Sequence, residues 1–307
     1  MAKNFENLFE LMQFFKTEKD CIIYLKKALW KDGVYCPHCG GVEVMEYTDV
    51  KRNRCKDCKK DFSIRKGTIF EDSNISLRKW FMACYLFNAH KKGISSCQLA
   101  RDIGVSQPTA WFMLQRLRYA SREMFNEQFS GITEIDEVYI GGSEKNRHLK
   151  DKLATGEKEK TVVIGMVNRE TKRVKAMRVP RAEKDFLLPK ININVEERSV
   201  IITDTLPAYK DLRKHYDHKT VKHSAGEYVK NDSRIAFKIH TNTIEGFWSL
   251  LKRGINGTYH WASKKHMNLY LAEYSLRYNT REIKDNERFA NFFAKKTGKI
   301  SYKQIIS

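Results

Sequence analysis

Apolar residues recur every three or four positions through most of the first 120 residues, which is the period of amphipathic helices. The pattern predicts helices over residues 4–30 and Ser76–His90, and a helix, a turn and a helix over residues 95–120. Between them, residues 34–70 contain only short strand-like runs around four cysteines. The first part of the chain is therefore predicted to be helical, with a small cysteine-bearing segment.

The pattern changes after residue 131, where short β-rich runs replace the helical period. The runs are Ile132–Ile140, Thr161–Val167, Arg173–Val179 and Val200–Thr203. The intervening Ser143–Lys160 is highly charged and lacks an apolar period, so we predict a mobile loop there. From about Thr243 the chain is helical again. The whole pattern predicts a multidomain α/β protein, divided into residues 1–70, 71–125 and 131–307.

Four cysteines occur as two similar pairs, Cys36-Pro37-His38-Cys39 and Cys55-Lys56-Asp57-Cys58, with fifteen residues between them. Each pair can present two thiolates to one tetrahedral ion, so the spacing predicts a Zn²⁺ bound by all four cysteines. Because four thiolates close the coordination shell, this zinc would be structural, with His38 as a bystander. Four ordinary buried thiols or a redox dithiol are the alternatives.

The net charge of +20 points to a nucleic-acid partner, because DNA is a dense line of negative charge that attracts such a protein. The stretch Lys51–Lys66 alone has eight basic residues and two acidic ones. It would suit a phosphate backbone, and a solvated protein face would explain the run equally well. Charge alone thus favours a nucleic-acid partner over a merely soluble basic protein or one that meets acidic membranes.

No apolar run approaches the roughly 18 residues needed to span a bilayer, and Met1–Glu10 lacks the pattern of a signal peptide. We therefore expect a cytoplasmic protein with no membrane partner, in which thiols stay reduced. The three cysteines outside the pairs lie on predicted helical faces and are interpreted as small core residues. They are Cys21, Cys84 and Cys97.

Residues 95–110 have the pattern of a helix-turn-helix. Ser95 or Ser96 can cap the first helix, Gly104 suits the tight turn, and Ser106 can cap the second helix. The polar residues expected to meet bases or phosphates are Gln107, Thr109, Gln115, Arg116 and Arg118. The alternative is a plain helical hairpin inside a core.

The first of three candidate catalytic acids is Asp136, which interrupts the apolar alternation of the predicted strand Ile132–Ile140. Because successive side chains of a strand point to opposite faces, Glu134 shares the face of Asp136, whereas Glu137 points the other way. Glu134 is therefore also expected to lie close to any metal that Asp136 binds.

The other two acids end a strand and begin a helix. Asp204 follows the buried run Val200–Thr203, and an Asp at the C-terminal end of a strand commonly marks a site in α/β folds. Glu245 lies on the predicted C-terminal helix and shares a face with Lys252, which is two turns further on.

Carboxylates that converge from two strands and a helix repel one another unless cations neutralise them. Two Mg²⁺ ions about 4 Å apart would do so, and Mn²⁺ would substitute for them in an assay. Taken singly, each acid has a structural alternative: Asp136 as an exposed strand residue, Asp204 as a turn former, and Glu245 as part of a capping box with Asn242.

These residues carry a resemblance. The chain resembles transposases of a bacterial insertion-sequence family that have a zinc ribbon ahead of a DDE catalytic domain, and the likeness covers nearly its whole length. The segments that carry it are Trp30–Gly40, Phe62–Phe70, Glu134–Glu137, Thr203–Asp204, Asn242–Arg253 and Arg277–Asn279.

The resemblance implies a helical segment and zinc ribbon over residues 1–70, a helix-turn-helix domain over 71–125 and an RNase H-like domain over 131–307. It implies that Asp136, Asp204 and Glu245 form a metal-binding catalytic triad. It also implies that Lys252 contacts the DNA backbone near the cut. We expect further backbone contacts from the neighbouring Arg253, the Ser143–Lys160 loop and the Arg277–Arg281 segment.

The function expected is DNA transposition by a DNA-associated bacterial protein. The ribbon and helix-turn-helix would bind the terminal inverted repeats of an insertion sequence. The catalytic domain, in a homo-oligomer, would hydrolyse the ends and join the 3′ ends to a double-stranded target. The alternatives are a DNA-binding regulator derived from a transposase and a structure-specific nuclease with the same fold.

Overall fold

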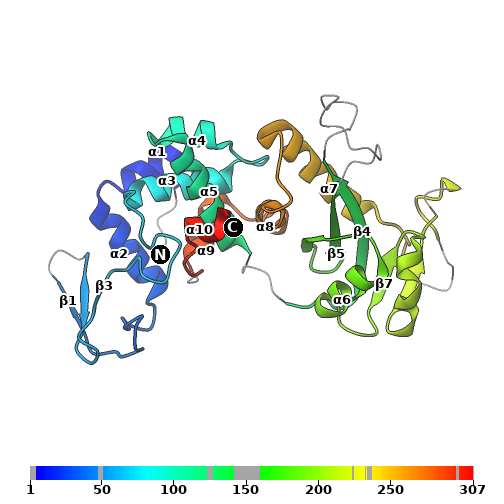
Figure 1. Cartoon of the computed structure of the whole chain (residues 1–307), viewed down its shortest axis with the longest axis horizontal. Coiled ribbons are helices and arrows are strands. Elements are labelled where there is room, and N and C mark those ends of the chain that lie inside the picture. The colour runs from blue at the N-terminus through cyan, green and yellow to red at the C-terminus, as the bar shows by residue number, and fades with distance from the viewer. Residues whose placement is uncertain are drawn as a thin grey trace. The chain divides into compact units, whose positions relative to one another are not determined.

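A computed structural model describes residues 5–47, 51–122, 127–141, 160–222, 225–231, 233, 237–294 and 297–306 (Figure 1). The chain forms two compact units, Met1–Met124 with Thr280–Ser307, and Phe125–Asn279. Apart from Lys160, the predicted mobile loop Ser143–Lys160 lies outside the described residues.

The first unit is helical apart from the segment that carries the paired cysteines. Its helices are α1 (Leu8–Phe14), α2 (Glu18–Leu29), α3 (Leu77–Ala89), α4 (Ser96–Ile103), α5 (Gln107–Ser121), α9 (Asp285–Phe293) and α10 (Tyr302–Ile306). Its antiparallel sheet has the strand order β1 (Val44–Glu46), β2 (Asn53–Cys55) and β3 (Asp61–Phe62).

The predicted helix over residues 4–30 is two helices, because a capping box starts a new helix at Thr17. The Thr17 side chain accepts from the backbone N–H of Asp20 (3.2 Å), and the Asp20 carboxylate accepts from the backbone N–H of Thr17 (2.7 Å). These reciprocal bonds satisfy donors that a continuous helix would have bonded internally.

The predicted succession of a helix, a turn and a helix is confirmed as α4 and α5. The side chain of Ser95 accepts from the backbone N–H of Gln98, and that of Ser106 accepts from the backbone N–H of Thr109. Gly104 ends α4 with φ 61°, a left-handed conformation that suits glycine. The serine caps and the glycine thus set the helix ends where the sequence placed them.

The C-terminal residues 280–307 belong to the first unit, not to the domain predicted over 131–307. Figure 1 shows the red C-terminal helices beside the blue and cyan helices of the N-terminal part. The ring of Phe289 lies 5.5 Å from that of Phe81 and 6.1 Å from that of Phe15, and Phe293 lies 4.9 Å from Phe81. Burial of these rings explains the assignment, since aromatic side chains contribute the largest apolar areas to a core.

The second unit is built on a five-stranded mixed sheet in the order β6-β5-β4-β7-β8. Strand β5 pairs antiparallel with both β4 and β6, whereas β7 and β8 run parallel to β4. This is the strand order and direction of an RNase H-like fold. The strands are β4 (Ile132–Ile140), β5 (Thr161–Asn168), β6 (Val174–Val179), β7 (Val200–Thr203) and β8 (Asp217–Thr220).

Helical segments of the second unit pack on both faces of this sheet. One core joins the sheet to α7 (Asn242–Gly254) and α8 (Met267–Asn279), and a separate core joins it to α6 (Lys184–Asn194) and the 3₁₀ helix η3 (Pro207–Lys214). A short π-helix, η5 (Ile255–Tyr259), continues α7. Among the described helices of both units, none is long and apolar enough to cross a membrane.

The four predicted strands are confirmed, and β8 was not predicted. Its sequence, Asp-His-Lys-Thr, lacks apolar alternation because it forms an edge strand whose side chains are at most half-buried. A polar edge strand therefore leaves no periodic signal for sequence analysis to detect.

Candidate metal centres and catalytic site

The four paired cysteines come together in the first unit. The Sγ atoms of Cys36 and Cys58 lie 3.7 Å apart, and those of Cys39 and Cys55 lie 3.6 Å apart. All four lie within 4.8 Å of one another. A tetrahedral zinc with Zn–S bonds of about 2.3 Å separates its sulfurs by about 3.8 Å, so this set fits a closed structural Zn²⁺ site.

The cysteines outside the pairs divide into two kinds. Cys21 and Cys84 are fully buried, as predicted for small core residues, and burial raises the pKa of the Cys21 thiol to about 12. Cys97 is exposed, so its prediction as a core residue is wrong. It lies off the buried face of α4, which consists of Leu99, Ala100 and Ile103.

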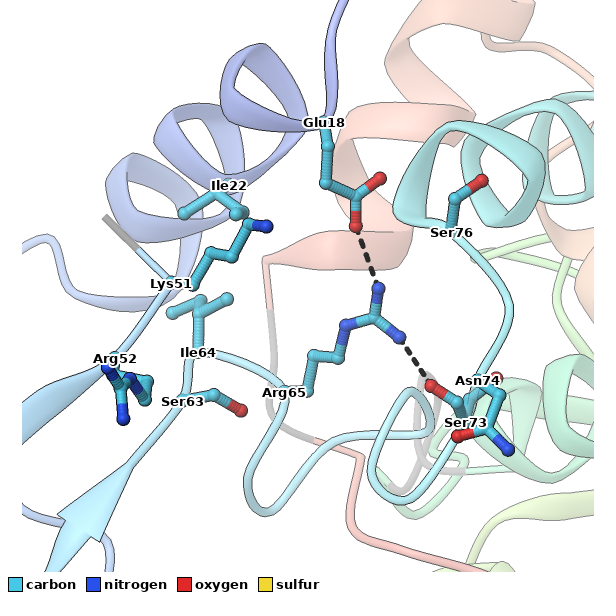
Figure 2. Close-up of a pocket in the computed structure, with 10 residues that line it drawn as sticks. All are labelled: Glu18, Ile22, Lys51, Arg52, Ser63, Ile64, Arg65, Ser73, Asn74 and Ser76. Carbon is cyan, nitrogen blue, oxygen red and sulfur yellow. Dashed lines mark hydrogen bonds and ion pairs between the residues drawn. The ribbon is translucent and has the colours of Figure 1, made fainter. Parts of the chain in front are cut away.

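A pocket of about 550 Å³ in the first unit is lined partly by the basic run Lys51–Lys66 (Figure 2). Within it, the Arg65 guanidinium donates to Glu18 Oε1 (2.8 Å) and to the backbone oxygen of Ser73 (2.7 Å). Arg65 therefore ties the ribbon segment to the rest of the unit. Lys51 and Arg52 line the same pocket.

In the second unit, the sheet brings two predicted acids together. The pairing of β4 with β7 ends at Glu134 opposite Ile202. Two residues further along each parallel strand stand Asp136 and Asp204, and β7 itself ends at Thr203. Carboxylate oxygens of Asp136 and Asp204 lie within 4.8 Å of each other in the resulting cluster.

Glu137 is the third member of this cluster, and sequence analysis did not assign it. Strand alternation places it on the face opposite Asp136. Beyond Glu134, however, no described strand pairs with the edge of β4 that faces β7, and carboxylates from both faces of β4 lie close to Asp204 there. The buried Tyr209 hydroxyl of η3 donates to Glu137 Oε2 (2.7 Å) and holds it.

Glu245 comes to this region from the first turn of α7. Its carboxylate is outside the group of mutually close ligand atoms, and it lies near enough to raise the pKa of Asp136. The Thr241 hydroxyl donates to Glu245 Oε1 (3.3 Å). The described acids thus form a tight cluster of three with Glu245 at its side.

Glu134 caps α7 from the neighbouring strand. Its carboxylate accepts from the backbone N–H groups of Thr243 (2.9 Å) and Ile244 (3.1 Å), and from Arg169 Nε (2.7 Å). Glu134 is not a member of the cluster of mutually close acids, because its oxygens accept from the helix and the arginine. The alternative of an Asn242–Glu245 capping box is also absent, since α7 has no side-chain cap from its own segment.

Trp248, one turn after Glu245, orients Asp136. Its indole Nε1–H donates to Asp136 Oδ2 (2.9 Å). The ring lies against Gly165, which pairs with Asp136 across β4 and β5. A Cβ added to Gly165 would lie 2.4 Å from Trp248 Cη2, so only glycine leaves room for this arrangement.

Burial and mutual repulsion shape the charge of the cluster. Burial raises the pKa of Asp136 to about 6, and the nearby Asp204 and Glu245 carboxylates add to the rise. Burial also raises the pKa of Glu137 to about 7, against the hydrogen bond from Tyr209. A cation bound here would reverse both effects, because opposite charge favours the carboxylate form.

The predicted DNA contacts on α5 are corrected in part. Gln107 and Thr109 lie in the first turn, with Gln107 exposed and Thr109 partly so. Gln115, Arg116 and Arg118 are buried, so their prediction as DNA contacts is wrong. Arg116, for example, donates to the backbone oxygen of Ile69 (2.7 Å), because the later turns of α5 cross the interior of the first unit.

On the helix that carries Glu245, Lys252 and Arg253 are exposed at the end of α7, as a DNA contact requires. Arg277 is buried and pairs with the buried Glu273 (2.6 Å), so it is not available to a DNA backbone. Asn279 accepts from the backbone N–H of Val174 (2.7 Å) and donates to its oxygen (3.0 Å). This part of the Arg277–Arg281 segment thus anchors α8 to the sheet.

Comparison with known proteins agrees with this architecture. Residues 128–279 match the model of the ISXO2-like transposase domain, and residues 16–61 match that of the transposase zinc-ribbon domain. A protein described as an uncharacterized protein in transposable element ISH50 of Halobacterium salinarum is 29% identical over 86% of this chain and 91% of its own length. An uncharacterized transposase-like protein of Haemophilus influenzae is 33% identical over 34% of this chain and 80% of its own length.

Among solved structures, a cryo-EM structure of the simian T-cell lymphotropic virus intasome in complex with PP2A regulatory subunit B56 gamma aligns with 59% of this chain and 64% of that chain. The alignment has 14% identity and a TM-score of 0.30, values too low to establish a shared fold. The family of this chain is established by the two family models and the Haemophilus relative, and the cysteine cluster and the mixed sheet agree with it. The chain belongs to the family of transposases that combine a zinc ribbon with an ISXO2-like transposase domain.

Proposed function

We propose that this chain is an active DDE transposase that cleaves DNA at the ends of an insertion sequence and joins the freed 3′ ends to target DNA. The observation that carries the proposal is the convergence of Asp136 and Asp204 where β7 ends, with Glu245 of α7 near Asp136. All three come from the segments predicted to hold the triad.

The donor set suits hard divalent cations such as Mg²⁺ or Mn²⁺, which prefer carboxylate oxygens and retain waters. Asp136, Asp204 and Glu245 would hold them. A bound pair would supply activation of the attacking oxygen and stabilisation of the leaving oxygen. Hydrolysis and strand transfer can then share one site, because they differ only in the nucleophilic oxygen.

The chain's own residues fix the positions of these ligands. The Trp248 N–H orients Asp136, and the backbone N–H of Leu206 donates to Asp204 Oδ1 (2.9 Å). Glu134 anchors the start of α7 and so sets where Glu245 lies. Two turns beyond Glu245, the exposed Lys252 would contact a phosphate on the strand being cut.

Recognition of the DNA ends falls to the first unit in this proposal. The first turn of α5 offers Gln107 and Thr109 to bases or phosphates. Lys51 and Arg52, at the pocket beside the ribbon, would contact the backbone. We propose that the active form is a homo-oligomer, because two ends must be cut in concert.

A strand-transfer assay tests the proposal. Zinc-loaded protein would be mixed with a labelled duplex of the element's inverted repeat, a supercoiled plasmid and Mg²⁺. The wild type should join label to the plasmid. Asp204→Asn should abolish joining and retain duplex binding, because it removes a metal ligand and not a DNA contact. Asp185→Asn, the same substitution at an exposed position on α6, serves as the control.

Each other outcome points to a different function. Nicking of the duplex without joining would indicate a structure-specific nuclease. Binding with neither product would indicate a DNA-binding regulator. Joining by Asp204→Asn at the wild-type rate would overturn the assignment of the site.

A further inference from the structure

Glu137 is a carboxylate that the DDE triad does not use. It lies beside Asp136 in sequence, and its oxygen is within 4.8 Å of ligand oxygens of both Asp136 and Asp204. By contrast, the carboxylate oxygens of Glu134, on the same face as Asp136, accept hydrogen bonds from the start of α7 and from Arg169. Glu137 therefore belongs to the cluster with Asp136, although strand alternation favours Glu134.

We propose that Glu137 is a fourth metal-binding carboxylate of the catalytic centre, and that Tyr209 positions it. This inference rests on the proposed function, since it concerns the same pair of divalent ions. The residue would bind a cation directly or through one of the waters that Mg²⁺ keeps.

Charge balance supports the assignment. Two divalent cations bring four positive charges, whereas Asp136, Asp204 and Glu245 supply three negative ones. Glu137 would supply the fourth and would balance the site before DNA phosphate arrives. A half-buried carboxylate near two others is costly without a cation, because each repels the rest in a medium less polar than water.

The Tyr209 hydrogen bond supports it further. Tyr209 is 1% exposed and belongs to the core between the sheet and η3, so its hydroxyl has a fixed place. That hydroxyl donates to one carboxylate oxygen of Glu137, Oε2, at 2.7 Å. Metal-binding carboxylates are commonly held by such a second hydrogen bond, which fixes the direction of the free oxygen.

The chain segment that supplies Tyr209 also follows directly from Asp204. The Asp204 carboxylate accepts from the backbone N–H of Leu206 at the turn into η3. The turn between β7 and η3 thus fixes the position of the Asp204 carboxylate and also that of Tyr209, which holds Glu137. Glu137 can therefore lie close to Asp204 although it leaves the opposite face of β4 from Asp136.

The test measures Mn²⁺ binding to the zinc-loaded full chain without DNA, by isothermal titration calorimetry and by the Mn²⁺ EPR signal. Glu137→Gln retains the size of the side chain and an oxygen that accepts from Tyr209, so it should fold. We expect it to weaken Mn²⁺ affinity between about tenfold and about a hundredfold. Tyr209→Phe should weaken it less, because the carboxylate remains but is no longer held.

Glu196→Gln, an exposed acid of the same unit outside the cluster, should leave Mn²⁺ binding unchanged. If Glu137→Gln binds Mn²⁺ as the wild type does while Asp204→Asn does not, the inference about Glu137 is overturned and the proposed function stands. If the wild type itself binds no Mn²⁺ and joins no DNA, the proposed function fails with it. Reduced strand transfer with unchanged Mn²⁺ affinity would also overturn the inference.

Discussion

At the scale of single residues, the absence of a side chain at Gly165 is as important for the site as the acids are. Gly165 lies opposite Asp136, and the Trp248 ring occupies the space where a Cβ would be. The ring can therefore cross the strand and donate to Asp136. The geometry of the Asp136 carboxylate, which we propose to be catalytic, thus depends on a glycine in a different strand.

Gly165→Ala is expected to destabilise the second unit by about 1–3 kcal/mol, because the added methyl group overlaps Trp248 and Ile244. It should also displace the indole from Asp136 and slow strand transfer. Chemical denaturation and the joining assay measure the two effects. Gly246→Ala is the stability control, since a Cβ there meets nothing within 4 Å and alanine favours the helix. Equal stability of the two variants would contradict this account.

The raised pKa values of Asp136 and Glu137 predict how stability depends on pH. The folded metal-free protein holds these protons more tightly than the unfolded chain does. Their contribution to stability is therefore lost as pH rises from about 4 through about 7. His218 has the opposite effect on stability, because burial lowers its pKa from the ordinary 6.5 to about 4. Its contribution to stability is therefore lost as pH falls from 6.5 through about 4.

Thermal unfolding of zinc-loaded protein across this pH range can separate the contribution of the two carboxyl groups from that of His218. An Asp136→Asn, Glu137→Gln double variant should lose less stability than the wild type as pH rises, because neither group titrates. Added Mg²⁺ should stabilise the wild type more near pH 8 than near pH 5, where it competes with protons. Parallel curves for wild type and double variant would refute the prediction.

At the scale of elements, α7 is positioned by a cap that comes from another element. Glu134 of β4 satisfies two of the N–H groups that begin the helix, while Arg169 neutralises its charge. The helix start is thereby fixed to the strand that carries Asp136. This contact links Glu245 to Asp136 more firmly than a cap within α7 would.

Glu134→Ala is expected to cost about 3–5 kcal/mol of stability, because it leaves the Arg169 charge and two helix N–H groups without their partner. Hydrogen exchange at the Thr243 and Ile244 amides should accelerate. Asn242→Ala, at the residue the sequence suggests as a cap, should change stability by less than about 0.5 kcal/mol. The reverse order of effects would show that the helix is capped locally after all.

At the scale of the whole molecule, the chain leaves the first unit, forms the second and returns. Helix α9 completes the aromatic core that Phe15 and Phe81 begin. The first unit therefore cannot complete its core until the C-terminal segment has been made. Its stability depends on residues more than two hundred positions from the rings they contact.

Phe289→Ala is expected to destabilise the first unit by about 3–5 kcal/mol, since it removes a fully buried ring. The second unit should keep its stability, because its cores do not include this residue. Hydrogen exchange followed by mass spectrometry reports each unit separately. Asn291→Ala, at an exposed position of α9, should leave both units unchanged. Loss of protection confined to the second unit would disprove the division.

Local patterns in the sequence were sufficient to predict the four clustered cysteines, the ends of α4 and α5, and strands β4 to β7. Cysteine spacing, serine caps and apolar alternation each act within a few residues, so they can be detected without knowing the fold. Asp136 and Asp204 were found for the same reason, since each is an acid in or after an apolar strand. They meet because parallel strands in register bring equivalent positions together.

The partners of long polar side chains depended on contacts distant in sequence. Strand alternation favours Glu134 over Glu137 as the neighbour of Asp136. Glu134 instead caps a helix and Glu137 joins the acids, because β7 stops at Thr203 and η3 supplies Tyr209. Arg116 is buried for a similar reason, as a loop distant in sequence supplies its acceptors. Periodicity specifies which face a side chain leaves from, and the packing of other elements specifies what it meets there.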